Sequence, residues 1–269
     1  MRVRKPRRPS YFNASDLRES VGSERDAFRI WKLPALVDVG GTGRFREELA
    51  ELGLAGLVAA GLQRSPMFSR VRRDANRIEI LGVRTEVVAA ATNPENHEVV
   101  KRLLRSLLPF AVSLAPCYEY VSLSPSNQLI HPARVFSVAR SRQAIGKNRG
   151  FYSDWDDDAS ELLLALHKET KAVRVGLGLE RRFHRTLWDG TVRHTPRSLT
   201  RVHRSALALA ELTLPVRHTP LGAQLDYRHR FFEEDIGEGL TYMVAMGERA
   251  GIAMPRAREI CDWYWALPG

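Results

Sequence analysis

The sequence predicts an α/β region followed by an all-α region. Up to about residue 120, short apolar runs alternate with amphipathic segments, as strands and crossover helices do in a parallel sheet. From His131 onward, strand signals are few and long helical patterns dominate. The 269 residues suffice for one large core or two modest ones. We therefore expect three parts: a basic, poorly ordered segment 1–34, an α/β part 35–120 and an α-helical part 121–269.

The α/β part contains the predicted strands. Residues 33–39 and 54–60 are short apolar runs, separated by a glycine turn and an amphipathic helix that ends near Gly53. Residues 77–83 and 85–90 alternate or run apolar, as a strand pair does. Asn93 and Pro94 open a helix with the apolar face Val99, Val100, Leu103, Leu104 and Leu107. These elements are too few for a complete doubly wound domain and correspond to the second half of one.

Four helices are predicted in the second half of the chain. Residues 159–178 place Leu162, Leu163, Leu166, Val173 and Leu177 near one stripe, and the glycines at the end are typical of a helix C-terminus. Residues 200–212, 237–251 and 255–267 have further helical patterns. We find no internal repeat and no low-complexity segment.

The net charge of +10 has two interpretations. A polyanionic partner such as nucleic acid would select for basic residues. However, arginines are spread through the whole chain, and aromatic residues are not interleaved with them as a stacking platform requires. A basic surface without a nucleic-acid partner therefore explains the charge better.

The lack of a recognisable membrane or secretory signal, together with the cysteine usage, predicts a cytoplasmic protein. No run approaches the roughly 18 apolar residues that a transmembrane helix needs. The basic start lacks the apolar stretch of a secretory signal. Cys117 and Cys261 are not spaced as metal ligands, so a reduced compartment is the expected setting.

His131 is the strongest candidate for proton chemistry. It precedes Pro132, which suits the first turn of a helix, and a helix N-terminus disfavours the imidazolium cation. A neutral imidazole can exchange protons near neutral pH. Asn127 lies one helical turn earlier and could hydrogen-bond a ligand. Residue types alone favour a capping or surface role for His131, and an N-cap or Asx turn explains Asn127 equally well.

Arg230 and Asp235 form a second candidate group. A guanidinium suits a bidentate grip on a substrate carboxylate. A buried aspartate beside a histidine would fix its tautomer and stabilise the imidazolium. Glu233 and Glu234 are also explained as an acidic helix start that complements the dipole, and that interpretation does not need Arg230.

The turn at Gly40, Gly41 and Thr42 is a candidate for cofactor contact. Its backbone N–H groups could face a phosphate, but the spacing differs from the GxGxxG fingerprint, and such a turn is more often only a turn.

Two other kinds of site are excluded by spacing. The histidines at 184, 194, 203 and 218 are scattered among arginines without metal-ligand spacing. Ser122, Ser124 and Ser126 are not in a GxSxG elbow, which argues against a hydrolase of that type.

Several motifs, in order, resemble the octopine/nopaline (opine) dehydrogenase family. The stretch from Ser126 to Pro132 is similar to its Asn-x-x-x-His-Pro segment, and the stretch from Asp226 to Leu240 to its Arg-aromatic-x-x-Glu-Asp segment. Residues 37–43 and 80–90 resemble strands of the later half of its nucleotide domain; residues 151–152 and 250–255 resemble its aromatic pair and a following turn. The resemblance covers roughly residues 35–267.

The resemblance implies a partial Rossmann-like sheet, an opine dehydrogenase-type helical domain and the family's reaction. That reaction is an NAD- or NADP-dependent reductive condensation of an amino acid with a 2-oxo acid. By position, His131 would donate the proton, Asp235 would orient His131, Arg230 would bind substrate or couple domain closure to cofactor binding, and Asn127 would line the cleft.

The chain departs from the family before Leu33, where no strand–GxGxxG–helix unit is found. This departure predicts a family member whose N-terminal nucleotide half is missing, through a mis-called start, a gene break or a separate subunit. A homodimer partner or a separate nucleotide-binding subunit would then take part in cofactor binding. A non-catalytic relic or interaction module built on the helical domain is the alternative.

Overall fold

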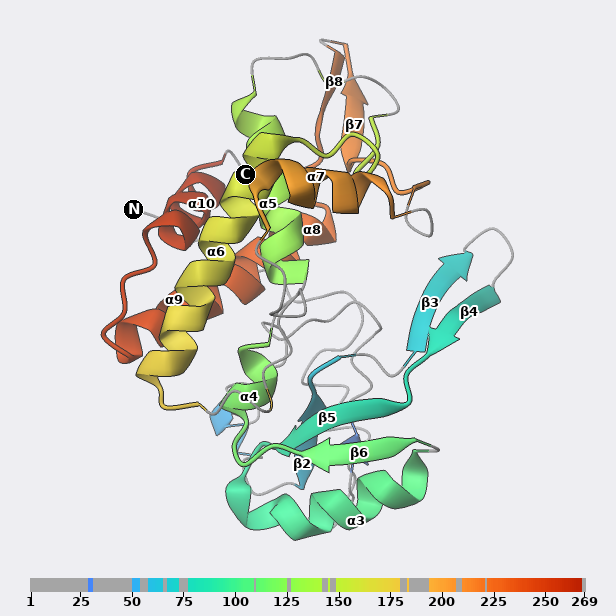
Figure 1. The fold of residues 1–269 in the computed structure, drawn as a ribbon, viewed down its shortest axis with the longest axis vertical. Coiled ribbons are helices and arrows are strands. Elements are labelled where there is room, and N and C mark those ends of the chain that lie inside the picture. The colour runs from blue at the N-terminus through green and yellow to red at the C-terminus, as the bar shows by residue number, and fades with distance from the viewer. Residues whose placement is uncertain are drawn as a thin grey trace. The chain divides into compact units, whose positions relative to one another are not determined.

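A computed structural model gives the architecture of the chain (Figure 1). It describes residues 29–30, 50–53, 58–64, 67–72, 77–108, 110–124, 127–141, 145, 149–179, 183, 194–206, 210–220 and 222–267. These residues belong to two compact units, described separately below. The sheet unit contains the described residues up to 124 together with Leu179 and Phe183, and the helical unit contains the rest. The predicted fold class, an α/β part followed by a mostly helical part, is confirmed.

The sheet unit is built on four strands in the order β1-β2-β5-β6. Their bounds are Arg29–Ile30, Ala59–Leu62, Glu86–Ala91 and Ala111–Leu114. β1 pairs parallel with β2, and β5 parallel with β6, but β2 and β5 run antiparallel with Gly61 opposite Ala90. The prediction of a parallel sheet is therefore wrong at its centre. The cause is the connection after β2, which contains a hairpin instead of a crossover helix, so the chain re-enters the sheet in the opposite direction.

The hairpin also corrects the predicted strand pair. β3 (Met67–Arg72) and β4 (Arg77–Val83) pair with each other, whereas β5 belongs to the main sheet. Residues 77–83 and 86–91 are thus both strands, as predicted, but they do not pair. The two strands also differ in burial. Ile80 and Val83 of β4 are exposed, whereas the alanines at the end of β5 are buried.

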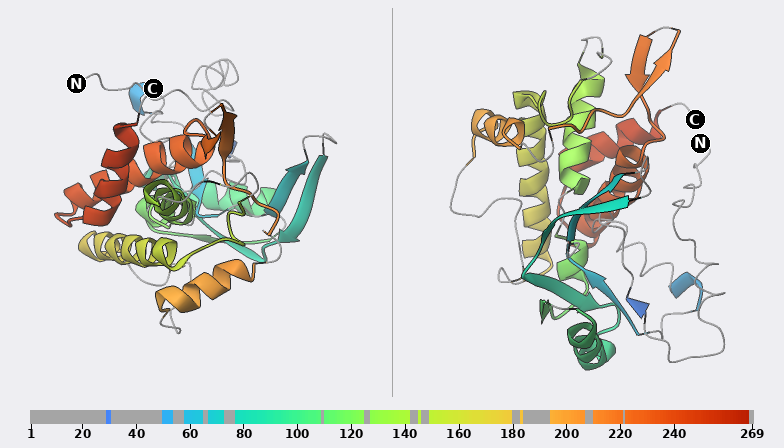
Figure 2. Two further views of the ribbon diagram at one scale, coloured as in Figure 1. Left: turned by 90° about the horizontal axis from the view of Figure 1, so that it is seen from above. Right: turned by 90° about the vertical axis from the view of Figure 1, so that its right-hand side faces the viewer.

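Helix α3 (His97–Leu107) packs against the main sheet (Figure 2). Its start agrees with the prediction, because the Asn93 side chain accepts a hydrogen bond from the Glu95 backbone N–H at 3.0 Å and Pro94–Asn96 form a 3₁₀ turn, η2. Val100 and Leu104 are buried in the core with residues of β2, β5 and β6. The short helix α4 (Glu119–Ser122) lies in a second cluster of the same unit.

Two other predictions for this region meet the structure only in part. The predicted strand 33–39 and most of the helix before Gly53 lie outside the described residues, as do Gly40, Gly41 and Thr42. Ala50 and Glu51 are helical, and Gly53 follows at φ 69°, a conformation that favours glycine at a helix end. The strand predicted for 54–60 is described from Ala59 to Leu62.

The helical unit contains α5 (Asn127–Arg140), α6 (Asp157–Gly176), α7 (Pro196–Arg204), α8 (Arg230–Phe232), the π-helix η5 (Glu233–Leu240), α9 (Thr241–Arg249) and α10 (Pro255–Trp265). α6 packs beside α5 (Figures 1 and 2). The π-helix η5 contacts α5, α8, α9 and α10. The unit is not all-helical, because β7 (Val216–Thr219) and β8 (Gly222–Leu225) form an antiparallel hairpin. Their four-residue length and half-exposed, largely polar sequence gave no apolar strand signal.

Two helix starts differ from the predictions. The helix predicted for 200–212 begins at Pro196, because Thr195 and Ser198 form a reciprocal capping box, and it ends at Arg204. Helix α5 is already formed at Asn127, so Pro132 lies in its second turn and not in its first. Among the described residues, no helix is long and apolar enough to cross a membrane.

Candidate active site

His131 is buried in the helical unit and hydrogen-bonded to Asp235. The side chain comes from α5 and is only 3% exposed, and its Nδ1 lies 2.7 Å from Oδ2 of Asp235 on η5. The two residues are 104 positions apart in the sequence. The structure therefore brings together the histidine and the aspartate that the sequence analysis paired. Because His131 lies in the second turn of α5 and not in the first, the helix N-terminus acts on its imidazole less than we expected.

Burial controls the protonation of this pair. It raises the pKa of Asp235 to about 8, although the positive charge of Arg230 opposes the increase. A lone buried carboxylate is thus disfavoured at neutral pH. The pair as a whole is favoured in the form without net charge, in which Nδ1 and Oδ2 share a proton. This form has a proton to give.

Two phenylalanines fix the plane of the imidazole. The Phe231 ring stacks on it, with ring centres 3.9 Å apart, and the Phe151 ring meets it edge-on at 5.2 Å. Both phenylalanines are buried, and their own rings lie 5.1 Å apart. The imidazole is therefore enclosed by apolar rings on two sides and tied to a carboxylate in its own plane.

Arg230 supplies a positive group beside the pair. Its guanidinium carbon lies 5.1 Å from the centre of the Phe231 ring. Its Nη1 is buried and has no hydrogen-bond partner in the described part of the chain. An unpaired buried donor of this kind is costly in a folded protein, and an anionic ligand would satisfy it.

Glu234 is a further half-buried carboxyl group in the first turn of η5. Burial raises its pKa to about 7, and the charge of Asp235 adds to the effect while Arg230 opposes it. Of the three acidic residues that begin η5, Asp235 alone is buried. An acidic helix start therefore explains Glu233 and Glu234 but not the burial of Asp235.

The family relationship follows from the helical unit. Residues 115–267, more than half of the chain, match the family model described as NAD/NADP octopine/nopaline dehydrogenase, alpha-helical domain. The chain belongs to the octopine/nopaline dehydrogenase family. The predicted resemblance is thereby confirmed.

Individual relatives are distant. An uncharacterised protein y4xO of Sinorhizobium fredii is 24% identical over an alignment of 208 residues that covers 70% of this chain and 55% of that protein. An octopine dehydrogenase structure with NADH and pyruvate superposes with a TM-score of 0.65 at 18% identity and covers 90% of this chain. A yersinopine dehydrogenase structure with bound NADP⁺ gives 0.55 at 13% identity over 84% of this chain. This family member spans about half of the curated relative and 62% of each of these two dehydrogenase structures.

The remaining predicted site residues have different outcomes. Asn127 is the first described residue of α5, one turn before His131, and is half-buried. Gly40, Gly41 and Thr42 lie outside the described residues. Among the described residues, no group of three His, Cys, Asp or Glu side chains could hold a metal ion.

Sequence reasoning missed two buried residues on the elements that carry His131 and Asp235. Arg134, three positions later on α5, is fully buried. Gly239 on η5 faces Gln128 so closely that a Cβ there would collide with Gln128 Cγ and lie 3.2 Å from its Cβ. An arginine inside an apolar helix pattern, at His131 plus three, was the available signal for Arg134.

Proposed function

We propose that this chain carries the proton-transfer and substrate-binding residues of an opine dehydrogenase-type oxidoreductase. The reaction is the NAD(P)H-dependent reductive condensation of an amino acid with a 2-oxo acid to a secondary amine. The observation that carries the proposal is the buried 2.7 Å contact between His131 and Asp235, with the unpartnered Nη1 of Arg230 next to it. Membership of the octopine/nopaline dehydrogenase family supports it.

His131 would act as the general acid. Asp235 occupies Nδ1, so proton exchange with the substrate falls to Nε2. His131 would give its Nε2 proton to a carbonyl oxygen or an imine nitrogen, the shared proton would pass to Nδ1, and the negative charge would remain on Asp235, where the positive charge of Arg230 offsets it. The rings of Phe151 and Phe231 would keep water from the sides of the imidazole that they cover.

Arg230 would bind the carboxylate of the 2-oxo acid. The unsatisfied donor beside an apolar ring gives a charge-assisted hydrogen bond high value, because little water competes for it. Asn127, one turn before His131 on the same helix, would contact the same substrate.

The cofactor supplies hydride when bound, and the donor set around His131 fits a reaction in which the protein supplies only the proton. Related structures contain NADH or NADP⁺, according to their descriptions. In the proposal, a second copy of the chain or a separate subunit contributes to nucleotide binding.

The test is an NAD(P)H oxidation assay. The purified chain is assayed with NADH and NADPH, with panels of 2-oxo acids and amino acids, alone and with the product of any neighbouring gene that encodes a strand–GxGxxG–helix unit. His131→Ala should reduce kcat by a factor of roughly 10² to 10⁴. His218→Ala, which removes an exposed histidine of β7, is the matched control and should leave turnover unchanged.

Two outcomes would reject the proposal. One is the absence of cofactor oxidation and cofactor binding under every combination. The other is turnover that His131→Ala does not alter. The first would favour the alternative of a non-catalytic interaction module.

A further inference from the structure

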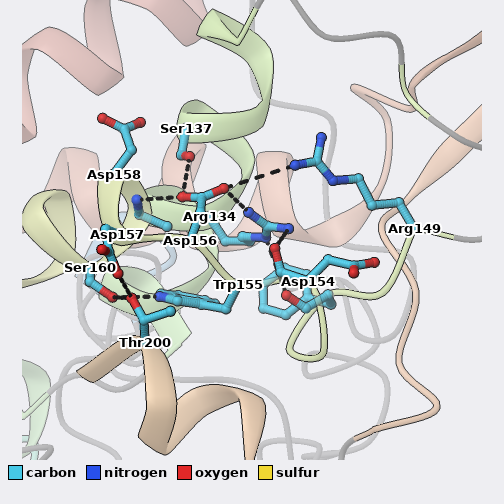
Figure 3. Close-up of polar contacts among 12 residues, drawn as sticks. Arg134, Ser137, Arg149, Asp154, Trp155, Asp156, Asp157, Asp158, Ser160 and Thr200 are labelled. Atoms are coloured by element: carbon cyan, nitrogen blue, oxygen red, sulfur yellow. Dashed lines mark hydrogen bonds and ion pairs between the residues drawn. The ribbon is translucent and has the colours of Figure 1, made fainter. Parts of the chain in front are cut away.

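Arg134 is a buried cation that binds the chain segment next to His131. It lies on α5 three residues after His131, and it is 0% exposed. Its Nε donates to the Phe151 carbonyl at 3.2 Å and its Nη2 to the Asp154 carbonyl at 2.5 Å. Its Nη1 donates to Oδ2 of Asp156 at 2.6 Å (Figure 3). The planar guanidinium thus fixes three points of one short segment, which a lysine could not do.

The other end of that segment is fixed as well. Asp156 is the N-cap of α6, and its Oδ1 accepts hydrogen bonds from the Ala159 backbone N–H at 2.8 Å and from Ser137 Oγ at 2.9 Å. Figure 3 shows these contacts converging on Asp156 between α5 and α6. Burial alone would raise the pKa of Asp156, but the contacts with Ala159, Arg134 and Ser137 outweigh it and lower that pKa. The segment 151–156 is therefore held against both helices by a charged aspartate.

Phe151 connects this clamp to the imidazole. Its carbonyl accepts from Arg134, and its ring contacts both His131 and Phe231. A shift of the Phe151 backbone would therefore move one of the two rings that set the imidazole plane.

We propose that Arg134 is a positioning residue for His131, acting through Phe151, with Asp156 as its anchor. The inference rests on the proposed function in that it assigns Arg134 a part in proton transfer by His131. Its physical content is that the guanidinium sets the angle at which the imidazole meets Asp235 and a substrate.

The primary test is spectroscopic and uses the full chain. Nitrogen-15 NMR resonances of the His131 imidazole are compared between the wild type and Arg134→Lys, which keeps the charge and loses the fork. The expected result is a shift of the Nδ1 signal and a weaker Nδ1–H hydrogen bond to Asp235. Unchanged His131 resonances in a folded Arg134→Lys protein would overturn the proposal.

Two further variants separate positioning from stability. Ser160→Ala removes the hydrogen bond that Trp155 Nε1 donates to Ser160 Oγ at 2.9 Å, on the α6 side of the same segment. It should destabilise the fold and leave the His131 resonances in place. Phe151→Leu should reproduce the shift, and adding it to Arg134→Lys should add nothing. If Arg134→Lys does not fold, unchanged resonances in Phe151→Leu would reject the proposal.

Activity provides an independent readout. With a substrate pair identified, Arg134→Lys should lower kcat on the order of tenfold to a hundredfold and change KM little, as misplacement of a reacting group does. Equal loss in kcat for Ser160→Ala would contradict the positioning role. The NMR result does not depend on turnover, so failure of the proposed reaction and failure of the clamp would be told apart.

Discussion

The two units of the chain bury different kinds of polar group. Among the described residues of the sheet unit, the buried polar side chains are uncharged: Gln63, Ser122 and Ser124. Gln63 satisfies its amide within that unit, with Ser124 Oγ at 2.6 Å and the Phe183 carbonyl at 2.7 Å. The helical unit also buries uncharged polar side chains, such as Gln128 and Ser160, and in addition buries ionisable ones: His131, Arg134, Arg174, His203 and Asp235.

This difference indicates where the chemistry lies. Burying an ionisable group costs free energy unless it is paired, and a pair of apolar residues would often stabilise a fold equally well. Two of these groups, His131 and Asp235, are hydrogen-bonded to each other, and Arg134 binds the carbonyl of Phe151, whose ring contacts the imidazole. Clusters of this kind are common at functional sites. The predictions below test whether the contrast between the units is one of function or only of packing.

The largest effect is expected at Asp235. Asp235→Asn keeps the shape of the side chain but cannot stabilise an imidazolium, so kcat should fall by a factor of roughly 10² to 10⁴ in the assay described above.

The same variant tests the raised pKa of Asp235. In the native state the His131–Asp235 pair keeps its shared proton up to about pH 8, whereas in the unfolded chain the free histidine holds a proton only up to its ordinary pKa of about 6.5. The stability due to the pair is therefore lost as pH rises from about 6.5 towards 8. Urea unfolding should show this loss in the wild type and not in Asp235→Asn; identical pH slopes would contradict it.

The matching change in the sheet unit should affect stability alone. Leu104 on α3 is fully buried in an apolar core, so Leu104→Ala should lower the free energy of unfolding by about 2–5 kcal/mol. The hydrogen bond between His131 and Asp235 and the ring contacts with Phe151 and Phe231 lie within the helical unit. Its NMR resonances should therefore stay in place in this variant. Movement of those resonances would show that the contrast between the units is not local.

Sequence reasoning reached the site more fully than the sheet. His131 and Asp235 stood out because their short motifs occur in family order, although 104 residues separate them. The antiparallel centre of the sheet depends on the β3–β4 hairpin, and an apolar strand has the same local pattern in either direction. Arg134 resembled the many solvated arginines because its acceptors, at 151, 154 and 156, are brought to it only by the fold.

His203 tests buried ionisable groups outside the candidate site. Its ring stacks on Trp155 at 4.1 Å, its Nε2 is buried without a hydrogen-bond partner among the described residues, and burial lowers its pKa to about 4. Between about pH 4 and 6.5, His203 therefore binds a proton in the unfolded chain but not in the native state. Stability from this group is present above pH 6.5 and is lost as pH falls towards 4, by up to about 3 kcal/mol. His203→Phe keeps the stacking and should reduce this loss. Comparing the free energies of unfolding of the two proteins at pH 7, where His203 is largely unprotonated in both states, measures the packing difference alone. An equal loss of stability in acid for both proteins would show that His203 is not its cause.

The smallest effect, and the one with the most informative sign, is expected at Gly239. Helix propensity alone predicts that Gly239→Ala stabilises the protein by about 1 kcal/mol. The contact with Gln128 predicts the opposite, a loss of about 1–3 kcal/mol, because the added methyl group meets the stem of a buried side chain on α5.

The same contact lies close to the His131–Asp235 pair. Gln128 precedes His131 by three residues on α5, and Gly239 follows Asp235 by four on η5, so the close approach lies about one turn from the 2.7 Å hydrogen bond. Gly239→Ala should therefore also shift the His131 resonances. Adding Gln128→Ala removes the collision and should restore both stability and resonances, with Gln128→Ala alone as the control. If the double variant recovers stability but not the resonances, η5 does not set the distance between Asp235 and His131, and the ring contacts of Phe151 and Phe231 would be its remaining determinant.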